Sequence, residues 1–252
     1  MPLLCDLIDL PAHPLISIVG AGGKTTTMYT LASELAQRGG RVITTTTTQI
    51  FFPEPGQTGA LIVAAETPTL LEMIGAAWQQ YRRVTVAGAI IRADKLAGLQ
   101  PGQPYELLMH SGAGAVIVEA DGARHRMIKA PAEHEPVVAL HTNVAFLMMS
   151  AGAINQPLNT EIAHRPERIA AVEGMNLGEI LTPTHIARLM TNEQGALKDI
   201  PKTAKTYLLI THPSMTRQDA LQELVSLVRR SQRVAGVLCS EQPGAWSASA
   251  FS

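Results

Sequence analysis

The chain has few of the features that mark disulfide-rich or zinc-binding proteins. Its 252 residues include only two cysteines, Cys5 and Cys239, which lie far apart in the sequence. Two isolated cysteines exclude a disulfide framework and a cysteine-rich zinc site, and they fit a reducing, cytoplasmic compartment. The eight histidines are scattered and do not have the spacing of a helical zinc motif.

An excess of charge of one sign and a long apolar run are also missing. The 20 basic and 21 acidic residues give a formal net charge of −1, so we expect neither nucleic acid nor an anionic membrane as a partner. The longest apolar run, Val144–Met149, is far too short to span a membrane. Residues 1–11 carry two aspartates and no basic start, so they do not predict a signal peptide.

What is present is a hydrophobic content of 46%, ample for a core, in a chain of a length that suits one sizeable α/β domain or a domain with a subdomain. Apolar runs predict strands at 15–19, 41–46, 61–64, 84–86, 115–119, 144–149, 207–211 and 234–238. Amphipathic patterns predict helices at 25–38, 68–81, 166–172, 183–190 and 217–230, with a short one near 105–110. This alternation predicts an α/β fold whose mostly parallel sheet is covered by helices.

A glycine loop stands between the first predicted strand and the first predicted helix and reads Gly20-Ala21-Gly22-Gly23-Lys24-Thr25-Thr26. Glycines let the backbone approach an anion, so that several N–H groups converge on phosphate oxygens. Lys24 would place its charge on the outer phosphates, as a catalytic group, and Thr25 would give its hydroxyl to Mg²⁺. The stretch predicts a nucleotide-binding phosphate loop, as in P-loop NTPases.

The spacing of this loop is shorter than usual. The common motif has four residues between its first glycine and the Gly-Lys pair, whereas here only Ala21 and Gly22 separate Gly20 from Gly23-Lys24. The shortened loop followed by two threonines resembles the phosphate loop of the Mur ligase family of ATP-dependent ligases. The alternative is a glycine-rich turn that binds nothing, although folding alone gives little reason for Lys-Thr-Thr at a helix start.

A second motif is the apolar strand Val116-Ile117-Val118 that ends in Glu119-Ala120-Asp121-Gly122. A carboxylate at such a strand end commonly holds Mg²⁺ in phosphate-loop enzymes. We expect Glu119 to be the metal carboxylate, together with Thr25, and Asp121 to be a catalytic group that contacts the substrate or supports the site. The alternative is a loop carboxylate that only caps a turn.

Further polar clusters follow the predicted strands. Arg124, Arg126 and Lys129, with His125, would bind an anionic substrate, and Arg124 is a candidate catalytic residue; a solvated surface loop is the alternative. The threonine run 44–48 suits a strand, while Thr47, Thr48 and Gln49 would lie near the terminal phosphate or Mg²⁺. The segment 164–168 opens a helix and would bring a cation toward the site.

The expected nucleotide is ATP or another nucleoside triphosphate. Where a GTP-specific protein often carries Asn-Lys-x-Asp after a late strand, this chain has Thr211-His212-Pro213-Ser214, which weakens a GTPase interpretation. We expect residues 1–150 to form the nucleotide-binding core. Residues 151–252 would form a helical portion plus strands that return to the same sheet, with a soft boundary or as one domain.

Several clusters in order resemble the YqeC family over about residues 13 to 240: the loop 19–26, the threonines 44–47, Glu119-Ala120-Asp121-Gly122-Ala123, Lys129-Ala130-Pro131, His134-Glu135-Pro136 and His164-Arg165-Pro166-Glu167. That family is described as accessory to selenium-dependent molybdenum hydroxylases. The resemblance implies nucleotide and Mg²⁺ binding by the loop and Glu119. It also implies selenium cofactor biosynthesis as a context, with a molybdenum hydroxylase or its cofactor as partner.

Three functions remain open at this point. The first is an NTP-dependent accessory enzyme that transfers or hydrolyses the terminal phosphoryl group, with Lys24 and Mg²⁺ neutralising charge. The second is a Mur-like ligase that activates a carboxylate, for which the chain is short and shows no evident separate substrate domains. The third is a nucleotide-gated carrier or chaperone whose affinity for a partner enzyme changes on hydrolysis.

Overall fold

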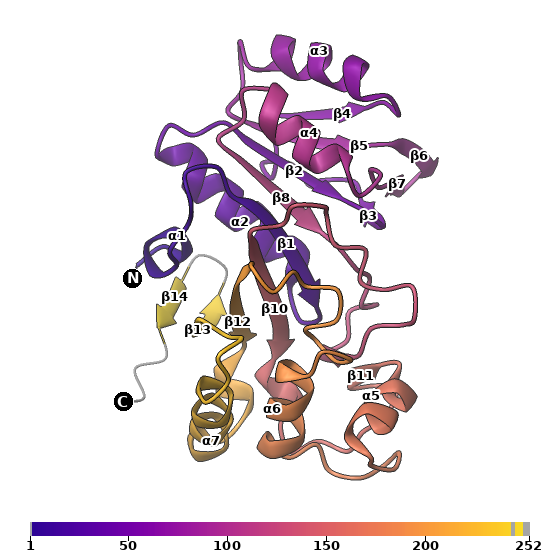
Figure 1. Ribbon diagram of the computed structural model, residues 1–252, viewed down its shortest axis with the longest axis vertical. Coiled ribbons are helices and arrows are strands. Elements are labelled where there is room, and N and C mark those ends of the chain that lie inside the picture. Colours follow the sequence, from indigo (N-terminus) through magenta and orange to yellow (C-terminus); the bar gives the residue numbers. More distant parts are fainter. Residues whose placement is uncertain (1, 243–244, 249–252) are drawn as a thin grey trace.

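The computed structural model describes residues 2–242 and 245–248, and a nine-stranded sheet forms its centre (Figure 1). Its strand order is β14-β13-β12-β10-β1-β8-β2-β5-β4, and the strands are β1 (Leu15–Gly20), β2 (Val42–Thr46), β4 (Ala60–Val63), β5 (Arg83–Ala87), β8 (Ala115–Glu119), β10 (Val144–Ser150), β12 (Lys205–Thr211), β13 (Gly236–Gln242) and β14 (Ala245–Ala248). All neighbouring strands run parallel except the pair β13 and β14. The predicted mostly parallel α/β fold is confirmed.

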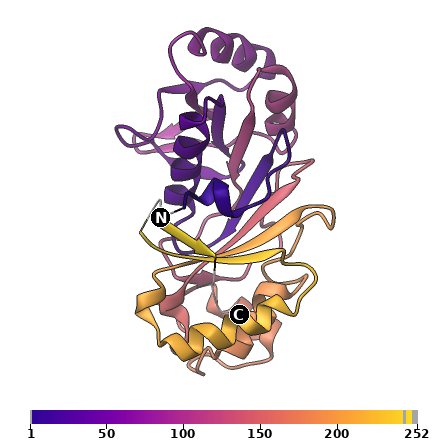
Figure 2. The same ribbon diagram turned by 90° about the vertical axis from the view of Figure 1, so that its left-hand side faces the viewer.

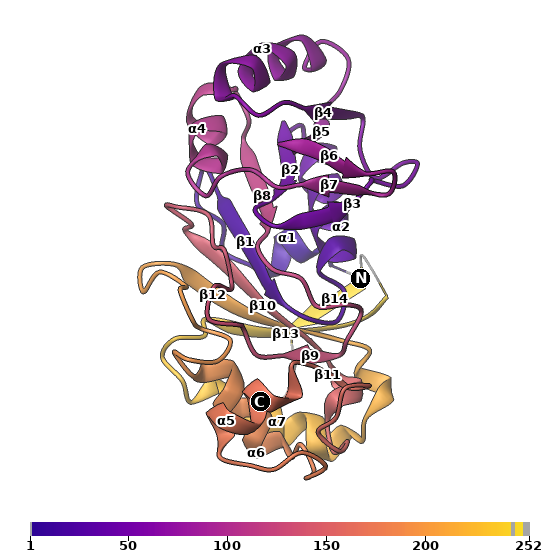
Figure 3. The same ribbon diagram turned by 90° about the vertical axis from the view of Figure 1, so that its right-hand side faces the viewer.

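Helices cover both faces of this sheet. One face carries α2 (Lys24–Gln37) and the short α1 (Leu4–Leu7). The other face carries two groups, α3 (Thr67–Ala77) with α4 (Gln103–His110), and α5 (Pro166–Glu173) with α6 (Pro183–Thr191) and α7 (Gln218–Arg229). Figures 2 and 3 show these two groups at opposite ends of the molecule. None of these described helices is long and apolar enough to cross a membrane.

Strand β1 shows why the sheet must be covered on both sides. Its side chains alternate between faces: Ile16 and Ile18 pack in the core with α2, whereas Leu15 packs with α3 and α4. Val19 packs in a separate hydrophobic core, beneath α5, α6 and α7. All seven residues of the neighbouring strand β10 are buried, as expected of a parallel strand with protein on each face.

The eight strands and six helices predicted from the sequence are all present, with ends shifted by a few residues. Six strands were not predicted: β3 (Gln49–Phe51), β6 (Ala89–Arg92), β7 (Lys95–Ala97), β9 (Ile128–Lys129), β11 (Ala163–His164) and β14. β3, β7 and β6 form a small antiparallel sheet, and β9 pairs with β11. These strands are two to four residues long, which is too short for an apolar pattern to identify them.

The late strands β12 and β13 lie in the same sheet as β1 and β10. The helices α5 and α6 lie between β10 and β12 in the chain, and α7 connects β12 to β13. The division into parts 1–150 and 151–252 stays a prediction, and the outer limits of both parts fall on residues outside the described ranges. What the topology does establish is that residues after 150 help to build the edge where the phosphate loop lies.

At Gly20 the end of β1 lies very close to β10. Both Gly20 and Gly39 have a positive φ, at +100° and +89°, but a Cβ at Gly20 would lie 2.3 Å from the Met148 carbonyl oxygen, whereas Gly39 faces open space. Alanine at either position costs about 1–3 kcal/mol of backbone strain, and at Gly20 overpacking adds about 1–3 kcal/mol. Urea unfolding should show the larger loss for Gly20→Ala; equal losses would contradict the close approach.

Candidate functional site

The glycine loop lies at the carboxyl edge of the sheet, between the end of β1 and the start of α2. Its three glycines all have a positive φ, at 100°, 82° and 112° for Gly20, Gly22 and Gly23. A Cβ at Gly22 would lie 2.6 Å from the Ser150 nitrogen at the end of β10. The sequence therefore needs glycine here both for backbone conformation and for space. The predicted order of strand, glycine loop and helix is confirmed.

The start of α2 adds an anion-binding end to the loop. The first hydrogen bond of the helix runs from Thr27 N–H to the Gly23 carbonyl oxygen, 2.9 Å long. The N–H groups of Lys24, Thr25 and Thr26 precede that bond, so the helix cannot satisfy them internally. With the dipole of a 14-residue helix behind them, they form the kind of helix start that holds phosphate.

Thr25 and Glu119, the two predicted metal ligands, come together in space. The Thr25 hydroxyl donates to Glu119 Oε2 over 2.6 Å, across 94 positions of sequence. Two oxygens bound side by side to Mg²⁺, each at about 2.0–2.1 Å, lie about 2.9 Å apart, so this pair fits the ion after a shift of a few tenths of an ångström. Both ligands are hard oxygens, which Mg²⁺ prefers.

The surroundings of Glu119 act on its charge in opposite directions. Glu119 is 7% exposed, and burial raises the pKa of its carboxyl group, although Lys24 and the Thr25 hydroxyl oppose that shift. A divalent cation at the Thr25–Glu119 pair would favour the charged carboxylate further. The chemistry of this donor set therefore fits a magnesium ion.

Lys24 turns back toward the carboxylates beside the loop. Its ammonium group donates to the Gly20 carbonyl oxygen at 2.8 Å and lies 3.2 Å from Asp121 Oδ1 and 3.8 Å from Glu119 Oε1. Burial lowers the pKa of Lys24, but the two carboxylates outweigh burial and raise the pKa above its usual value. Lys24 is thus a buried, charged ammonium for which an incoming phosphate would compete.

Asp121 ties the end of β8 to the phosphate loop. Its Oδ2 atom accepts a hydrogen bond from Gly20 N–H at 3.0 Å and lies 3.0 Å from the Lys129 ammonium. Asp121 is 2% exposed, so these partners take the place of the water that burial removes. The structure assigns Asp121 a positioning role for the loop, and direct contact with a substrate stays a prediction.

The ion pairs continue away from the loop as one charge network, made of Lys24, Glu119, Asp121, Lys129, Glu135 and Arg165. Lys129 donates to Glu135 Oε2 at 2.8 Å. Arg165 donates two hydrogen bonds to the same carboxylate, at 2.5 and 3.1 Å. Its three cations and three anions balance, which is what allows so many charges to be buried together.

Glu135 shows how strongly this network is coupled. Burial raises the pKa of Glu135, but hydrogen bonds from Arg165 and Lys129 outweigh burial and hold the pKa at about 2. The adjacent His164 has its pKa lowered to about 4 by burial, and by the charges of Arg165 and Lys129, so it is neutral at physiological pH. Arg165 is thus the cation that the segment 164–168 brings toward the site. It is connected to the site by its contact with Glu135, which in turn contacts Lys129.

The basic segment after Asp121 divides into two parts. Lys129 is buried and committed to Asp121, Glu135 and the Gly122 carbonyl oxygen, so the expectation that it binds substrate does not fit the structure. Arg124 and His125 are exposed, with φ of 48° and 58°, and the His125 ring stacks on Phe51. A role for Arg124 with an anionic substrate stays a prediction.

The threonine run braces the end of β8. Thr46 donates to the Glu119 carbonyl oxygen at 2.7 Å, and Thr47 donates to the Val137 carbonyl oxygen at 2.5 Å. These bonds place the backbone that carries Glu119. Phosphate or metal contacts by Thr47, Thr48 and Gln49 stay a prediction, and Gln49 itself begins strand β3.

Sequence reasoning missed the role of Glu135 and the contribution of the last strands. Glu135 follows a turn rather than a predicted strand, so no periodicity or strand end pointed to it. The ends of β12 and β13 could have been found, because ligands in parallel sheets bind beyond the carboxyl ends of the strands. Strand β14 runs antiparallel to β13, and it had no comparable signal.

Comparison with known proteins gives three findings. The model of a family described as "YqeC protein" matches residues 16–167. "Uncharacterized protein YqeC" of Escherichia coli (strain K12) is 28% identical over 205 residues, covering 78% of this chain and 76% of that protein. The signal recognition particle 54 kDa protein of Aeropyrum pernix K1, solved in complex with GDP, aligns with a TM-score of 0.43 and 14% identity. That alignment covers 98% of this chain, which spans 46% of that protein.

The charge network predicts a large stability cost when Lys129 is removed. Lys129→Met leaves Asp121 and Glu135 buried without their shared cation, which should lower the free energy of unfolding by about 3–5 kcal/mol. The matched control is Lys205→Met, because Lys205 pairs with Asp9 at the surface and should matter little. Urea unfolding of both variants checks this, and similar losses would show that Lys129 is not a structural cation.

Glu135 gives the stability a dependence on acid pH. A carboxyl group whose pKa falls from 4.5 to about 2 on folding contributes stability that is complete above its ordinary pKa and lost as the pH falls toward 2. The difference in melting temperature between the wild-type protein and Glu135→Gln should therefore shrink between about pH 6 and pH 2. A constant difference across that range would place the titration elsewhere.

Proposed function

The chain belongs to the YqeC family, whose matched region, residues 16–167, contains the whole phosphate loop and charge network, and we propose that it binds a magnesium–nucleoside triphosphate there. The loop Gly20 to Thr26 would hold the phosphates, and Thr25 with Glu119 would hold the metal. The reaction we propose is transfer or hydrolysis of the terminal phosphoryl group.

One observation carries this proposal. Thr25 and Glu119 lie 94 positions apart in the sequence, yet their oxygens lie 2.6 Å apart beside the Lys24 ammonium. A fold that needed only a glycine turn would have no reason to bury a carboxylate and an ammonium beside the half-buried Thr25 hydroxyl, since burial removes hydration from both charges. A phosphate loop with its metal site accounts for all three groups.

In this proposal the residues around the phosphate loop have separate roles. Lys24 would move its charge from Asp121 and Glu119 toward the outer phosphates, and the start of α2 would orient them through backbone N–H groups. Asp121 would keep its hold on Gly20 N–H and so fix the loop during that exchange. Magnesium, when bound, supplies positive charge that offsets the charge on the phosphate oxygens.

The finer role follows from the sequence resemblance. We propose ATP as the nucleotide and a cytoplasmic step in selenium and molybdenum cofactor maturation of a hydroxylase as the setting. The acceptor would be water, a selenium-containing precursor or the molybdenum cofactor itself. Arg124, exposed at the loop that follows Asp121, is the residue we propose for an anionic acceptor.

A second candidate function is favoured by the path of the charge network. The network leads from Lys24 at the phosphate loop to Arg165, the residue at the start of α5. Loss or gain of a phosphate at Lys24 would change the partners of Asp121 and, through Lys129, of Glu135. Such coupling suits a nucleotide-gated carrier, in which hydrolysis alters the affinity for a partner enzyme.

The proposal predicts magnesium-dependent binding of a triphosphate. Calorimetry with ATP and GTP should give measurable affinity that falls when Mg²⁺ is withdrawn. Lys24→Ala should weaken binding by about 2–5 kcal/mol, as expected when one member of a charged hydrogen-bonded pair is truncated. No measurable affinity of the wild-type protein for any triphosphate would refute the proposed function.

Two milder variants guard against a folding defect in Lys24→Ala. Thr25→Val removes the hydroxyl oxygen, and Glu119→Gln removes the negative charge and replaces one carboxylate oxygen by an NH2 group; both keep the shape of the side chain. Both should leave a cooperative unfolding transition and lose most of the Mg²⁺ dependence of binding. An unchanged Mg²⁺ dependence in both would move the metal site to other residues, with Asp121 the first to examine.

A further inference from the structure

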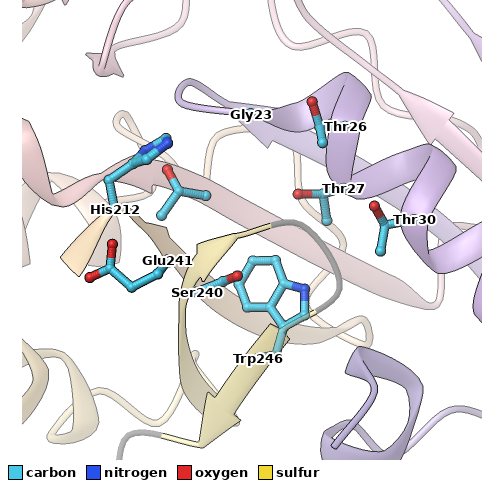
Figure 4. Close-up of a pocket in the computed structure, with 9 residues that line it drawn as sticks. Gly23, Thr26, Thr27, Thr30, His212, Ser240, Glu241 and Trp246 are labelled. Atoms are coloured by element: carbon cyan, nitrogen blue, oxygen red, sulfur yellow. The ribbon is translucent and has the colours of Figure 1, made fainter. Parts of the chain in front are cut away.

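A cavity of about 90 Å³ opens beside the phosphate loop, between α2 and the ends of β12, β13 and β14 (Figure 4). Gly23, Thr26 and Thr30 line it on the α2 side, and His212, Glu241 and Trp246 line it on the other side. None of the residues of the charge network lines this cavity. It lies beyond the carboxyl ends of parallel strands, the usual place for a ligand in such sheets.

The cavity is continuous with the phosphate loop. Gly23 and Thr26 belong both to the loop and to the cavity wall. Successive helix residues point about 100° apart, and here Thr25 turns to Glu119 while Thr26 turns to the cavity. A molecule whose phosphates lie on the loop can therefore place its other end in the cavity, on the side of α2 away from the metal pair.

Trp246 brings a donor that has no partner. Its side chain is 2% exposed, and its Nε1–H group finds no hydrogen-bond partner among the described residues. Leaving such a group unpaired in the interior costs the hydration that it lost on burial. In Figure 4 the indole stands between β13 and α2, with its nitrogen on the α2 side. An acceptor atom on a ligand in the cavity would remove that cost.

Glu241 brings an acceptor to the same cavity. Ser214 donates to this carboxylate from its backbone N–H at 2.5 Å and from its hydroxyl at 2.8 Å, which holds the group at the cavity wall. Each carboxylate oxygen has room for a further hydrogen bond. A carboxylate here disfavours a second anionic group and favours a neutral ring that carries N–H donors.

We propose that this cavity receives the nucleobase of the triphosphate, with Trp246 donating to a base acceptor and a base N–H donating to Glu241. Nucleobases are flat rings with donors and acceptors along their edges, which matches one donor and one acceptor in a narrow space. The proposal rests on the proposed triphosphate binding and adds where the base is read. Trp246 and Glu241 are then the residues that determine base specificity.

The test compares nucleotides with inorganic tripolyphosphate, which has the phosphates and no base. With Mg²⁺ present, ATP or GTP should bind at least tenfold more tightly than tripolyphosphate. Trp246→Phe keeps the ring and removes the N–H group, and should weaken the preferred nucleotide about tenfold, or about 1.4 kcal/mol, with tripolyphosphate unchanged. The matched control is Trp78→Phe, since Trp78 donates to the Ser111 carbonyl oxygen elsewhere in the fold; it should change neither affinity.

A second variant keeps the test open if Trp246→Phe is poorly folded. Glu241→Gln should change the relative affinities for ATP, GTP and CTP without changing that for tripolyphosphate. Nucleotides that bind no more tightly than tripolyphosphate would overturn the base site and leave the proposed function intact. Equal weakening of nucleotide and tripolyphosphate by both variants would also overturn it. No binding of tripolyphosphate or of any nucleotide would refute the proposed function itself.

Discussion

The buried ammonium group of Lys24 is the interaction on which the edge of this sheet depends. It lies 3.2 Å from Asp121 and 3.8 Å from Glu119, two carboxylates that would otherwise face each other with little water. Moving a charge out of water costs several kcal/mol, and only a well-placed partner offsets that cost. Asp121 also accepts a hydrogen bond from Gly20 N–H. The ion pair and the conformation of the phosphate loop therefore depend on each other.

This constraint explains the balance of charges farther away. Asp121 has Lys129 as a second partner, Lys129 has Glu135, and Glu135 has Arg165. Each buried charge needs the next, until the network reaches a side chain that is a quarter exposed. A phosphate that competed for Lys24 would act on this whole series, so the glycine loop and the start of α5 are physically linked through side-chain contacts.

Much of the fold followed from the chain because its physical signals are local. The eight buried strands are apolar runs, and α3, α5 and α6 have a proline in their first turn. The antiparallel β14 and the exposed β6 gave no such signal, since their place depends on the strands beside them. The candidate site was predictable where it follows a strand directly, at Lys24 and Thr25 after the glycine loop and at Glu119 and Asp121 at the end of β8. It was not predictable at Glu135 or Trp246, which other segments bring into position.

The sequence by itself determined the parallel α/β architecture, the glycine loop and the acidic strand end, because backbone preference and burial pattern act over a few residues. Only the tertiary structure decided that Thr25 meets Glu119, that Lys129 belongs to a buried ion-pair network rather than to a basic surface, and that Trp246 faces the phosphate loop across a cavity. The Thr25–Glu119 pair, the Glu135–Arg165 pair and the approach of Trp246 to the loop join residues tens to hundreds of positions apart. Their partners are set by which strands become neighbours in the sheet, and charge or hydrogen-bonding capacity in a linear chain does not specify that choice.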